Sequence, residues 1–324
     1  MKMTYAEAMA LAIRAALTAD PRVFLIGNLF AGVSASGRAA FAPLIQDFAA
    51  RVVTAPVSEA GLAGAALAGC RPLVDLGAAS FTFQAWSQLV NEAPNFHYMS
   101  GGRTRVPATY YALIGIRGAG AAQHSHRTQA MLANVPGLQV LLPATPADAY
   151  HQLKWALTES QNPTIYLPHA LLLEDEDAVD PAAPGLPVGR AQVLRAGQDV
   201  SVIAHSVTVR LALQAAEQLA ERHRVSVEVV DMRSVAPLDR ATMVASVAKT
   251  GRAVVADESH ASFGTGAELS ATLAEQAFSW LKAPVRRVAT PDVPVPFSPP
   301  LESALLVTPE KIAAAVLATL EAST

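Results

Sequence analysis

The feature of this 324-residue chain that most constrains its fold is a repeated alternation of short apolar, β-rich runs with longer helical segments. Strands that alternate with helices of this length indicate βαβ crossovers, and therefore parallel sheets covered by helices. In the first half of the chain we expect strands at 23–26, 52–54, 73–76, 109–114, 140–142 and 164–167. We expect helices there at 5–19, 59–68, 83–92 and 147–158.

The alternation is interrupted once, between Glu174 and Pro187, by a stretch rich in acidic residues and proline. Such a composition without clear periodicity is typical of a linker. Beyond it we expect strands at 200–204, 226–231, 253–256 and 285–288, and helices at 209–222, 241–247 and 267–277. The sequence therefore predicts an α/β chain of two domains, 1–173 and 189–324, each a mainly parallel sheet flanked by helices, with a linker at 174–188.

The composition excludes several classes of protein. Hydrophobic residues make up 52% of the chain and charged residues 16%, which excludes disorder. A net charge of −3 gives no basic footprint for nucleic acid. The mean hydropathy of +0.29 is high, yet no apolar run reaches the roughly 18 residues of a membrane span, and no signal-peptide pattern opens the chain. We therefore expect a cytoplasmic protein that buries its surplus apolar surface in subunit interfaces.

Cysteine and histidine give little sign of a metal site. Cys70 is the single cysteine, which excludes an internal disulfide and a cysteine-rich metal centre. Its alanine-rich surroundings predict a buried, unreactive thiol. His124 and His126 are two residues apart with no carboxylate or cysteine close by, so we predict no metal there.

Two polar positions remain as candidates. Glu59 follows Ser58 at the expected start of a helix, where a capping serine and an acid in the first turn have a purely structural explanation. His124 follows a loop rich in glycine and alanine, and loops of this kind often carry function. The chain has no dinucleotide-binding glycine pattern, P-loop, Gly-x-Ser-x-Gly turn or Gly-Asp-Gly diphosphate motif. The residues alone therefore leave the roles of Glu59 and His124 open.

Several sequence strings, spread along the chain in order, carry a resemblance to a known family. In the first domain they are APVSEAGLAG (55–64), FTFQA (81–85), YMSGG (98–102), AQHS (122–125), VPGL (135–138) and PATPADA (143–149). In the second domain they are VDMRSVAPLD (230–239), SVAKTGR (246–252), APVRRV (283–288) and PDVPVPFS (291–298). Together they resemble the β subunit of the decarboxylating component of 2-oxo acid dehydrogenase complexes of the pyruvate, branched-chain and acetoin types.

The resemblance implies a transketolase-like pyrimidine-binding domain followed by a transketolase C-terminal domain. It implies thiamine diphosphate as a cofactor shared with an α subunit in an α2β2 heterotetramer, in which the α subunit holds the diphosphate and Mg²⁺. The implied reaction is decarboxylation of a 2-oxo acid, or cleavage of acetoin, with transfer of the acyl group to a lipoyl carrier. A lipoyl acyltransferase is the further partner that this implies.

The resemblance also implies roles for single residues. Glu59 corresponds to the family's activating glutamate, which hydrogen-bonds a nitrogen of the aminopyrimidine ring so that the C2 proton of the thiazolium ring is removed. Val57 and Phe81 correspond to residues that contact the aminopyrimidine, although Phe81 has a plain core position as its alternative. His124 corresponds to the active-site histidine that stabilises intermediates or moves protons, including during acyl transfer.

The chain departs from the family pattern in several places. Asn28-Leu29-Phe30 replaces two acids after the first strand, and Pro168-His169 stands where an acid is common. The helix after Glu59 is about one turn shorter than usual. The loop 158–162, near the family's structural potassium site, is one residue longer, so that ion is not predicted.

His126 and Arg127 form a further departure, because they follow His124-Ser125 in place of a glutamine and a small residue. They suggest a changed substrate or acceptor, with a carboxylate or phosphate as the group to be bound, and a solvated surface pair as the alternative. Two other functions stay open. One is a thiamine-dependent carboligase or acyl-transfer subunit, and the other is a non-catalytic structural partner.

Overall fold

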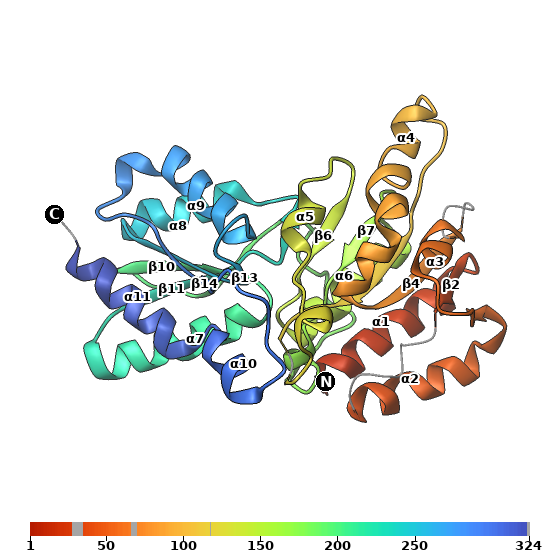
Figure 1. Cartoon of the computed structure of the whole chain (residues 1–324), viewed down its shortest axis with the longest axis horizontal. Coiled ribbons are helices and arrows are strands. Elements are labelled where there is room, and N and C mark those ends of the chain that lie inside the picture. The colour runs from red at the N-terminus through yellow and green to blue at the C-terminus, as the bar shows by residue number, and fades with distance from the viewer. Residues whose placement is uncertain (28–34, 66–69, 117, 323–324) are drawn as a thin grey trace. The chain divides into compact units, whose positions relative to one another are not determined.

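The computed structural model describes residues 1–27, 35–65, 70–116 and 118–322. They form two compact units, shown in Figure 1. The first unit comprises Met1–Arg117 and Gln123–Pro187, and the second comprises Gly118–Ala122 and Val188–Thr324. The division after Pro187 lies within the segment 174–188. Gly118–Ala122, which the sequence pattern places in the first domain, belongs structurally with the second unit.

The first unit is built on a parallel sheet in which its strands follow the order β6-β7-β5-β4-β2-β3. The strands are β2 (Val23–Ile26), β3 (Val52–Val53), β4 (Arg71–Ala78), β5 (Thr109–Leu113), β6 (Gln139–Leu141) and β7 (Thr164–Tyr166). β4 is buried along its whole length. This explains its nearly continuous apolar sequence, because a parallel strand is covered on both faces.

A short antiparallel pair accompanies this sheet. β1 (Lys2–Thr4) pairs with β8 (Glu176–Ala178), and Lys2 forms an ion pair with Glu176 at 2.7 Å. Part of the acidic segment that the sequence marks as linker is therefore a strand. β8 lies more than 170 residues from β1 in sequence, so a local sequence pattern does not predict that the two strands pair.

The helices of the first unit begin with α1 (Tyr5–Ala19), whose predicted bounds are confirmed. Thr4 and Glu7 form a reciprocal capping box: Thr4 Oγ1 accepts the Glu7 N–H at 3.1 Å, and the Thr4 N–H donates to the Glu7 carboxylate at 2.7 Å. The other α-helices are α2 (Ala35–Asp47), α3 (Glu59–Ala65), α4 (Phe96–Met99), α5 (Gln129–Ala133) and α6 (Pro146–Thr158). The expected end of the helix at residue 68 lies outside the described residues.

One predicted α-helix, at 83–92, is wrong in type. The chain forms a 3-10 helix, η2 (Ala79–Ala85), and then a π-helix, η3 (Ser87–Glu92). The Thr82 hydroxyl donates to the carbonyl of Ala79 at 2.7 Å, a local bond that favours the tighter winding. Three further short 3-10 helices are η1 (Ala49–Arg51), η4 (Ala122–His124) and η5 (Ala170–Leu172).

The second unit contains a five-stranded sheet with the order β14-β13-β10-β11-β9. Its strands are β9 (Gln192–Arg195), β10 (Val200–Ala204), β11 (Val227–Asp231), β13 (Ala253–His260) and β14 (Arg286–Thr290), and a short strand β12 (Ser234–Ala236) follows β11. All the pairings are parallel except that of β9 with β11. The mainly parallel sheet expected for this half of the chain is confirmed.

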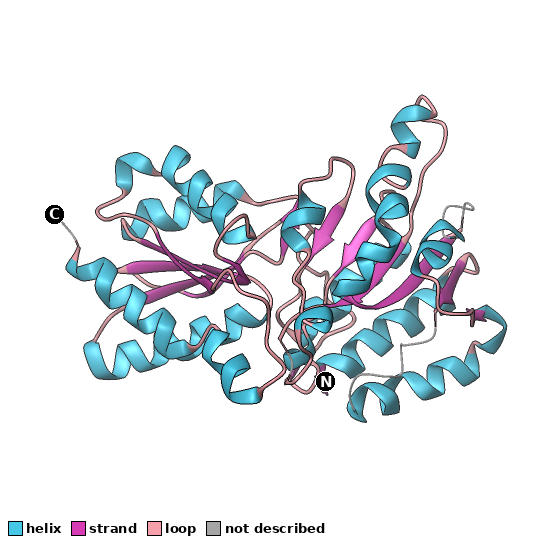
Figure 2. Cartoon of the chain, viewed as in Figure 1, coloured by secondary structure: helices cyan, strands magenta, loops and turns pink. Residues whose placement is uncertain are grey.

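Two layers of helices enclose that sheet, as Figure 2 shows. The helices are α7 (Val207–His223), α8 (Arg240–Thr250), α9 (Thr265–Gln276), α10 (Pro299–Leu305), α11 (Pro309–Glu321) and the 3-10 helix η6 (Phe278–Trp280). α8 and α9 pack together on one face, and α7 and α11 pack together on the other. The core beneath α8 and α9 is formed by Ile203, Val230, Met232, Met243, Val247, Val255, Leu269 and Leu273.

One segment of the described chain, Pro299–Glu321, has the length and composition of a membrane-crossing helix. The segment is interrupted, because α10 ends at Leu305 and α11 begins at Pro309. α11 packs against α7, β13 and β14. Neither helix alone has the roughly 20 residues that a span needs.

Cys70 is exposed, so the predicted burial of its thiol is wrong. It immediately precedes β4, whose burial begins only at Arg71. The apolar character of the surrounding stretch belongs to the strand and not to the residue in front of it.

Candidate active site

Glu59 is the first residue of α3 and its side chain is half-buried. The helix is capped by Ser58, whose Oγ accepts the N–H of Gly61 at 3.3 Å, so the cap does not use the Glu59 carboxylate. Among the described residues that carboxylate has no hydrogen-bond or ion-pair partner. α3 itself is anchored because Leu62 and Ala63 are buried where it packs against β4, η2 and η3. Within the part of the chain that the structure describes, Glu59 therefore offers a carboxyl group without a partner on an anchored helix.

Val57 lies two residues before Glu59 and is 80% exposed. Val57 therefore contributes apolar surface close in sequence to the polar carboxylate of Glu59. Both of these predicted contacts to an aminopyrimidine are thus open at the surface of this chain.

Phe81 and His124 lie in contact. Phe81 is a half-buried residue of η2, and His124 is the exposed last residue of η4. Their rings meet edge to face, with centroids 5.4 Å apart and planes at 87°. The flanking residues Ser80 and Thr82 are buried, which fixes the backbone from which the Phe81 ring projects.

A second imidazole is held by the same segment. His126 meets Phe83 edge to face with centroids 5.1 Å apart, and its Nδ1 lies 2.9 Å from Ser80 Oγ in a hydrogen bond. Ser80 and Phe83 were missed by sequence reasoning, although the Phe-x-Phe spacing matches the His-x-His spacing. Arg127 is half-buried, and its Nη1 donates to the carbonyl of Ser125 at 2.7 Å, within its own loop.

The sheet explains why these segments meet. η2 follows the carboxyl end of β4, and the loop that leads to His124 follows the carboxyl end of the neighbouring strand β5. α3 follows the carboxyl end of β3 in the same parallel sheet. In open α/β sheets ligands bind outside the carboxyl ends of the strands. The predicted residues therefore follow the carboxyl ends of the strands, where a ligand of this fold is expected.

Gly115 and the departure at His169 are related. Gly115 has φ of +106°, and a Cβ placed there would lie 2.0 Å from Nε2 of His169. The His169 ring is fully buried, and its Nδ1 accepts the N–H of Leu171 at 3.1 Å. His169 thus fills the space beside Gly115, at the start of the loop that leads to His124. The departure Asn28-Leu29-Phe30 lies outside the described residues.

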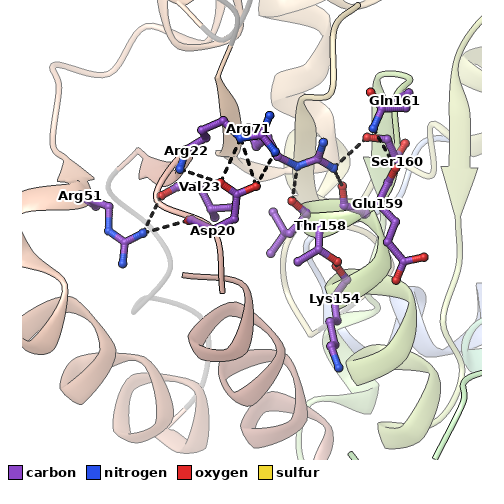
Figure 3. Close-up of polar contacts among 12 residues, drawn as sticks. Asp20, Arg22, Val23, Arg51, Arg71, Lys154, Thr158, Glu159, Ser160 and Gln161 are labelled. Atoms are coloured by element: carbon purple, nitrogen blue, oxygen red, sulfur yellow. Dashed lines mark hydrogen bonds and ion pairs between the residues drawn. The ribbon is translucent and has the colours of Figure 1, made fainter. Parts of the chain in front are cut away.

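A polar cluster of a different kind lies at the amino ends of the strands, as Figure 3 shows. Arg71, at the start of β4, is only 2% exposed and donates to the carbonyls of Leu157 at 2.5 Å and Ser160 at 2.8 Å. α6 has no basic residue in its last turn, so Arg71 supplies the positive charge that favours a helix C-terminus. Burial lowers the pKa of its guanidinium. The cluster joins the start of β4 to the end of α6, and it contains none of the predicted site residues.

A metal centre is not formed within the described ranges, where no three His, Cys, Asp or Glu side chains are grouped as ligands. The candidate residues offer a carboxyl group with no partner among the described residues, two imidazoles supported by aromatic rings, and an exposed apolar side chain. A planar heterocycle with ring nitrogens matches this set, because it combines hydrogen-bonding atoms with faces that pack on apolar side chains.

Comparisons with known proteins identify the family of the chain. Residues 1–174 match the transketolase pyrimidine-binding domain, and residues 189–312 match the transketolase C-terminal domain. The chain is 38% identical over 310 residues to the mitochondrial pyruvate dehydrogenase E1 component subunit beta-1 of Arabidopsis thaliana, covering 93% of this chain and 85% of the relative. It is 35% identical to the beta subunit of acetoin:2,6-dichlorophenolindophenol oxidoreductase of Cupriavidus necator, covering 96% and 95%. A solved split-gene transketolase, described as an inactive beta4 tetramer, superposes with a TM-score of 0.79 at 25% identity and covers 99% of both chains.

Fold and site together define a transketolase-like α/β chain with its pyrimidine-binding domain first. The chain belongs to the family of β subunits of thiamine-diphosphate-dependent 2-oxo acid dehydrogenases, and so to an oxidoreductase family. The family and the fold class expected from the sequence are confirmed.

Proposed function

We propose that this chain supplies the aminopyrimidine half of a thiamine-diphosphate site that is completed by an α subunit. The assembled enzyme decarboxylates a 2-oxo acid, or cleaves acetoin, and transfers the acyl group to a lipoyl carrier. One observation carries the proposal: the half-buried Glu59 carboxylate has no partner among the described residues, on a helix that Ser58 already caps. A carboxyl group placed in this way is available to a ligand.

The residues present fit the aminopyrimidine ring. Glu59 would hydrogen-bond a ring nitrogen, and Phe81 and Val57 would pack on the ring. When bound, the cofactor supplies a nucleophilic carbon and an electron sink for decarboxylation. Glu59 holds a proton at the ring nitrogen, and His124, oriented by Phe81, holds or delivers a proton at the substrate oxygen.

An α subunit is part of the proposal because the chain offers only half of a site. It has no Gly-Asp-Gly motif for diphosphate and Mg²⁺, and Val57 lies open to solvent. Tyr98 and Met99, at 87% and 78% exposed, add large apolar side chains to its surface, as a subunit interface requires. We propose an α2β2 heterotetramer with Mg²⁺ held by the α subunit, a lipoyl acyltransferase as its further partner, and a cytoplasmic setting.

The substrate side of the site is proposed to include His126 and Arg127. Ser80 and Phe83 contact the His126 ring, and the hydrogen bond that Arg127 Nη1 donates to the main-chain carbonyl of Ser125 holds the guanidinium in the same loop. Two such groups favour an anionic substrate. Arg127→Ala is expected to raise the KM for that substrate severalfold, and an unchanged KM would remove Arg127 from the site.

His126 and Arg127, which suggest a changed substrate or acceptor, also favour a second candidate function. A thiamine-dependent carboligase or acyl-transfer enzyme would use the same activated cofactor and a different acceptor. Formation of NADH when lipoyl and flavin components are added supports the dehydrogenase. Its absence, together with a carboligation product from an aldehyde, supports the second function.

Cofactor binding tests the shared site directly. The purified chain and its complex with a co-expressed α chain are titrated with thiamine diphosphate and Mg²⁺ by calorimetry. We expect weak binding by the single chain and stoichiometric binding by the complex. Tight stoichiometric binding by the single chain would contradict the shared site.

A further inference from the structure

The first unit carries a projecting arm, residues 93–105, whose tip is both apolar and cationic. The arm contains α4 and the turn after it, and Figure 1 shows α4 at the end of a projection beyond the sheet of this unit. Tyr98 and Met99, in α4, are 87% and 78% exposed. Arg103 and Arg105 follow where the chain returns, and both are exposed. The arm lies wholly within the first unit.

Hydrogen bonds within the arm hold its tip in one shape. Ser100 Oγ donates to the carbonyl of His97 at 3.1 Å and accepts the N–H of Thr104 at 3.0 Å. His97 Nδ1 bonds the carbonyl oxygen of Thr104 at 2.8 Å, and Arg103 Nε donates to the carbonyl of Ser100 at 2.9 Å. A surface that is already ordered loses less conformational entropy when a partner binds it.

The positive charges of the arm are unbalanced. Neither Arg103 nor Arg105 has an ion-pair partner among the described residues. The sequence contains no aspartate or glutamate between Glu92 and Asp148. Exposed cations next to exposed apolar side chains are complementary to a partner surface on which acidic side chains border an apolar pocket.

The arm is continuous in sequence with both segments of the candidate site. η2, which contains Phe81, leads into η3, and the arm follows η3. After the arm the chain enters β5, and the loop beyond β5 leads to His124. In the proposed assembly the α subunit completes the site that these segments begin. The α subunit is therefore the partner that this connection favours.

We propose that the arm is a docking element for the α subunit, with Tyr98 as its apolar anchor and Arg103 and Arg105 as its cationic rim. The α subunit presents an apolar pocket bordered by acidic side chains. Large aromatic side chains that fill a pocket contribute most of the binding energy in many interfaces. The inference rests on the proposed function, which requires an α subunit, and it adds the binding surface and the chemistry of its partner.

The anchor is tested by the association of this chain with a separately purified α chain that carries the Gly-Asp-Gly motif. Surface plasmon resonance gives kon, koff and Kd. We expect Tyr98→Ala to raise Kd by about thirtyfold or more, chiefly through koff. Phe278→Ala is the matched control, because Phe278 is 75% exposed in the second unit, and its Kd should match that of the wild type. An unchanged Kd for Tyr98→Ala would overturn the inference.

The cationic rim is tested by its salt dependence. Arg103→Glu combined with Arg105→Glu should lower kon about tenfold at about 0.05 M salt, and much less at about 0.5 M. Arg38→Glu, an exposed position on α2 of the same unit, is the matched control and should leave kon within about twofold of the wild type. A loss of kon that is equal at both salt concentrations, or equal in the control, would contradict an acidic partner surface.

The shape of the tip is tested by Ser100→Ala, which removes two of the bonds within the arm. Because the cations and the apolar anchor remain, kon should stay within about twofold of the wild type while koff rises severalfold. An unchanged koff would show that the order of the arm contributes nothing to binding.

Other occupants of the arm give other results. If Tyr98→Ala disperses an oligomer of the isolated chain in sedimentation and keeps the wild-type affinity for the α chain, the occupant is a second copy. If the isolated chain binds vesicles of phosphatidylcholine and phosphatidylserine, and only Tyr98→Ala loses them, the occupant is a membrane. Either result overturns the inference.

The inference and the proposed function fail in different ways. An assembled wild-type complex that exchanges no C2 proton of the cofactor overturns the proposed function. A wild-type complex that exchanges this proton, together with arm variants that bind the α chain as the wild type does, overturns the inference alone.

Discussion

The imidazole of His124 stands edge-on to the ring of Phe81, with 5.4 Å between the centroids. The same contact is repeated two residues further on, where Phe83 meets His126 at 5.1 Å. Because one pair joins η2 to the last residue of η4 and the other joins it to the loop that follows, one short segment contacts both imidazoles. A site built in this way is sensitive to changes in η2 that leave the histidines themselves untouched.

Replacement of Phe81 by Leu is expected to lower kcat for acyl transfer severalfold, because the edge contact contributes about 0.5–1.5 kcal/mol to holding His124. A double-mutant cycle with His124→Asn measures this coupling. The exposed Phe278, replaced by Leu, is the matched control. Strictly additive effects of the two changes would show that the rings are neighbours without a shared role.

Ser80→Ala tests the second imidazole. Loss of the bond to Nδ1 lets the His126 ring rotate, so KM for an anionic substrate should rise severalfold, as in His126→Gln. The double variant should show no further rise, because both changes disable the same group. Steady-state kinetics of the complex measure KM for Ser80→Ala, for His126→Gln and for the double variant. Full additivity would place Ser80 and His126 in separate roles.

Arg71→Met is expected to destabilise the first unit by about 2–4 kcal/mol. The substitution leaves the carbonyls of Leu157 and Ser160 without their charged donor in a buried place. Arg71→Lys keeps the charge but not the planar fork, and should give an intermediate loss. Urea unfolding of the isolated chain measures the effect. Arg105→Met is the control, because Arg105 is exposed in the same unit, and a loss as large as that of Arg71→Met would contradict the assignment.

Asp20 gives a pH-dependent prediction. The hydrogen bond from Arg22 holds the pKa of Asp20 at about 2, below its ordinary value of 3.8. Because the folded pKa is depressed, this stabilisation is present above pH 4 and is lost as the pH falls through about 2. Asp20→Asn should therefore lower Tm at pH 6, and the difference should narrow steadily between pH 4 and 2. An equal difference across that range would show that the carboxylate charge contributes nothing.

Much of the fold follows from local patterns in the sequence. α1 keeps its predicted bounds because Thr4 and Glu7 complete a capping box at its start. β10 keeps its predicted bounds, 200–204, because it is a fully buried apolar run. The helix expected at 83–92 differs in type, because its first residues belong to the 3-10 helix η2, where the Thr82 hydroxyl bonds the carbonyl of Ala79, and the chain then winds as a π-helix.

The site residues were reached by resemblance, whereas their supports were not. Glu59 and His124 stand in strings long enough to compare with a family. Ser80 and Phe83 act through contacts across 43 residues or more, and a local pattern does not show which ring they meet.

In the proposed function, the Glu59 carboxyl activates a cofactor held between this chain and an α subunit. Exchange of the cofactor's C2 proton with deuterium, measured in the assembled complex, reports that step directly. We predict rapid exchange in the wild type and a loss of about a hundredfold or more in Glu59→Gln, with assembly unchanged. Near-normal exchange in an intact Glu59→Gln complex would show that Glu59 is only the first residue of a helix.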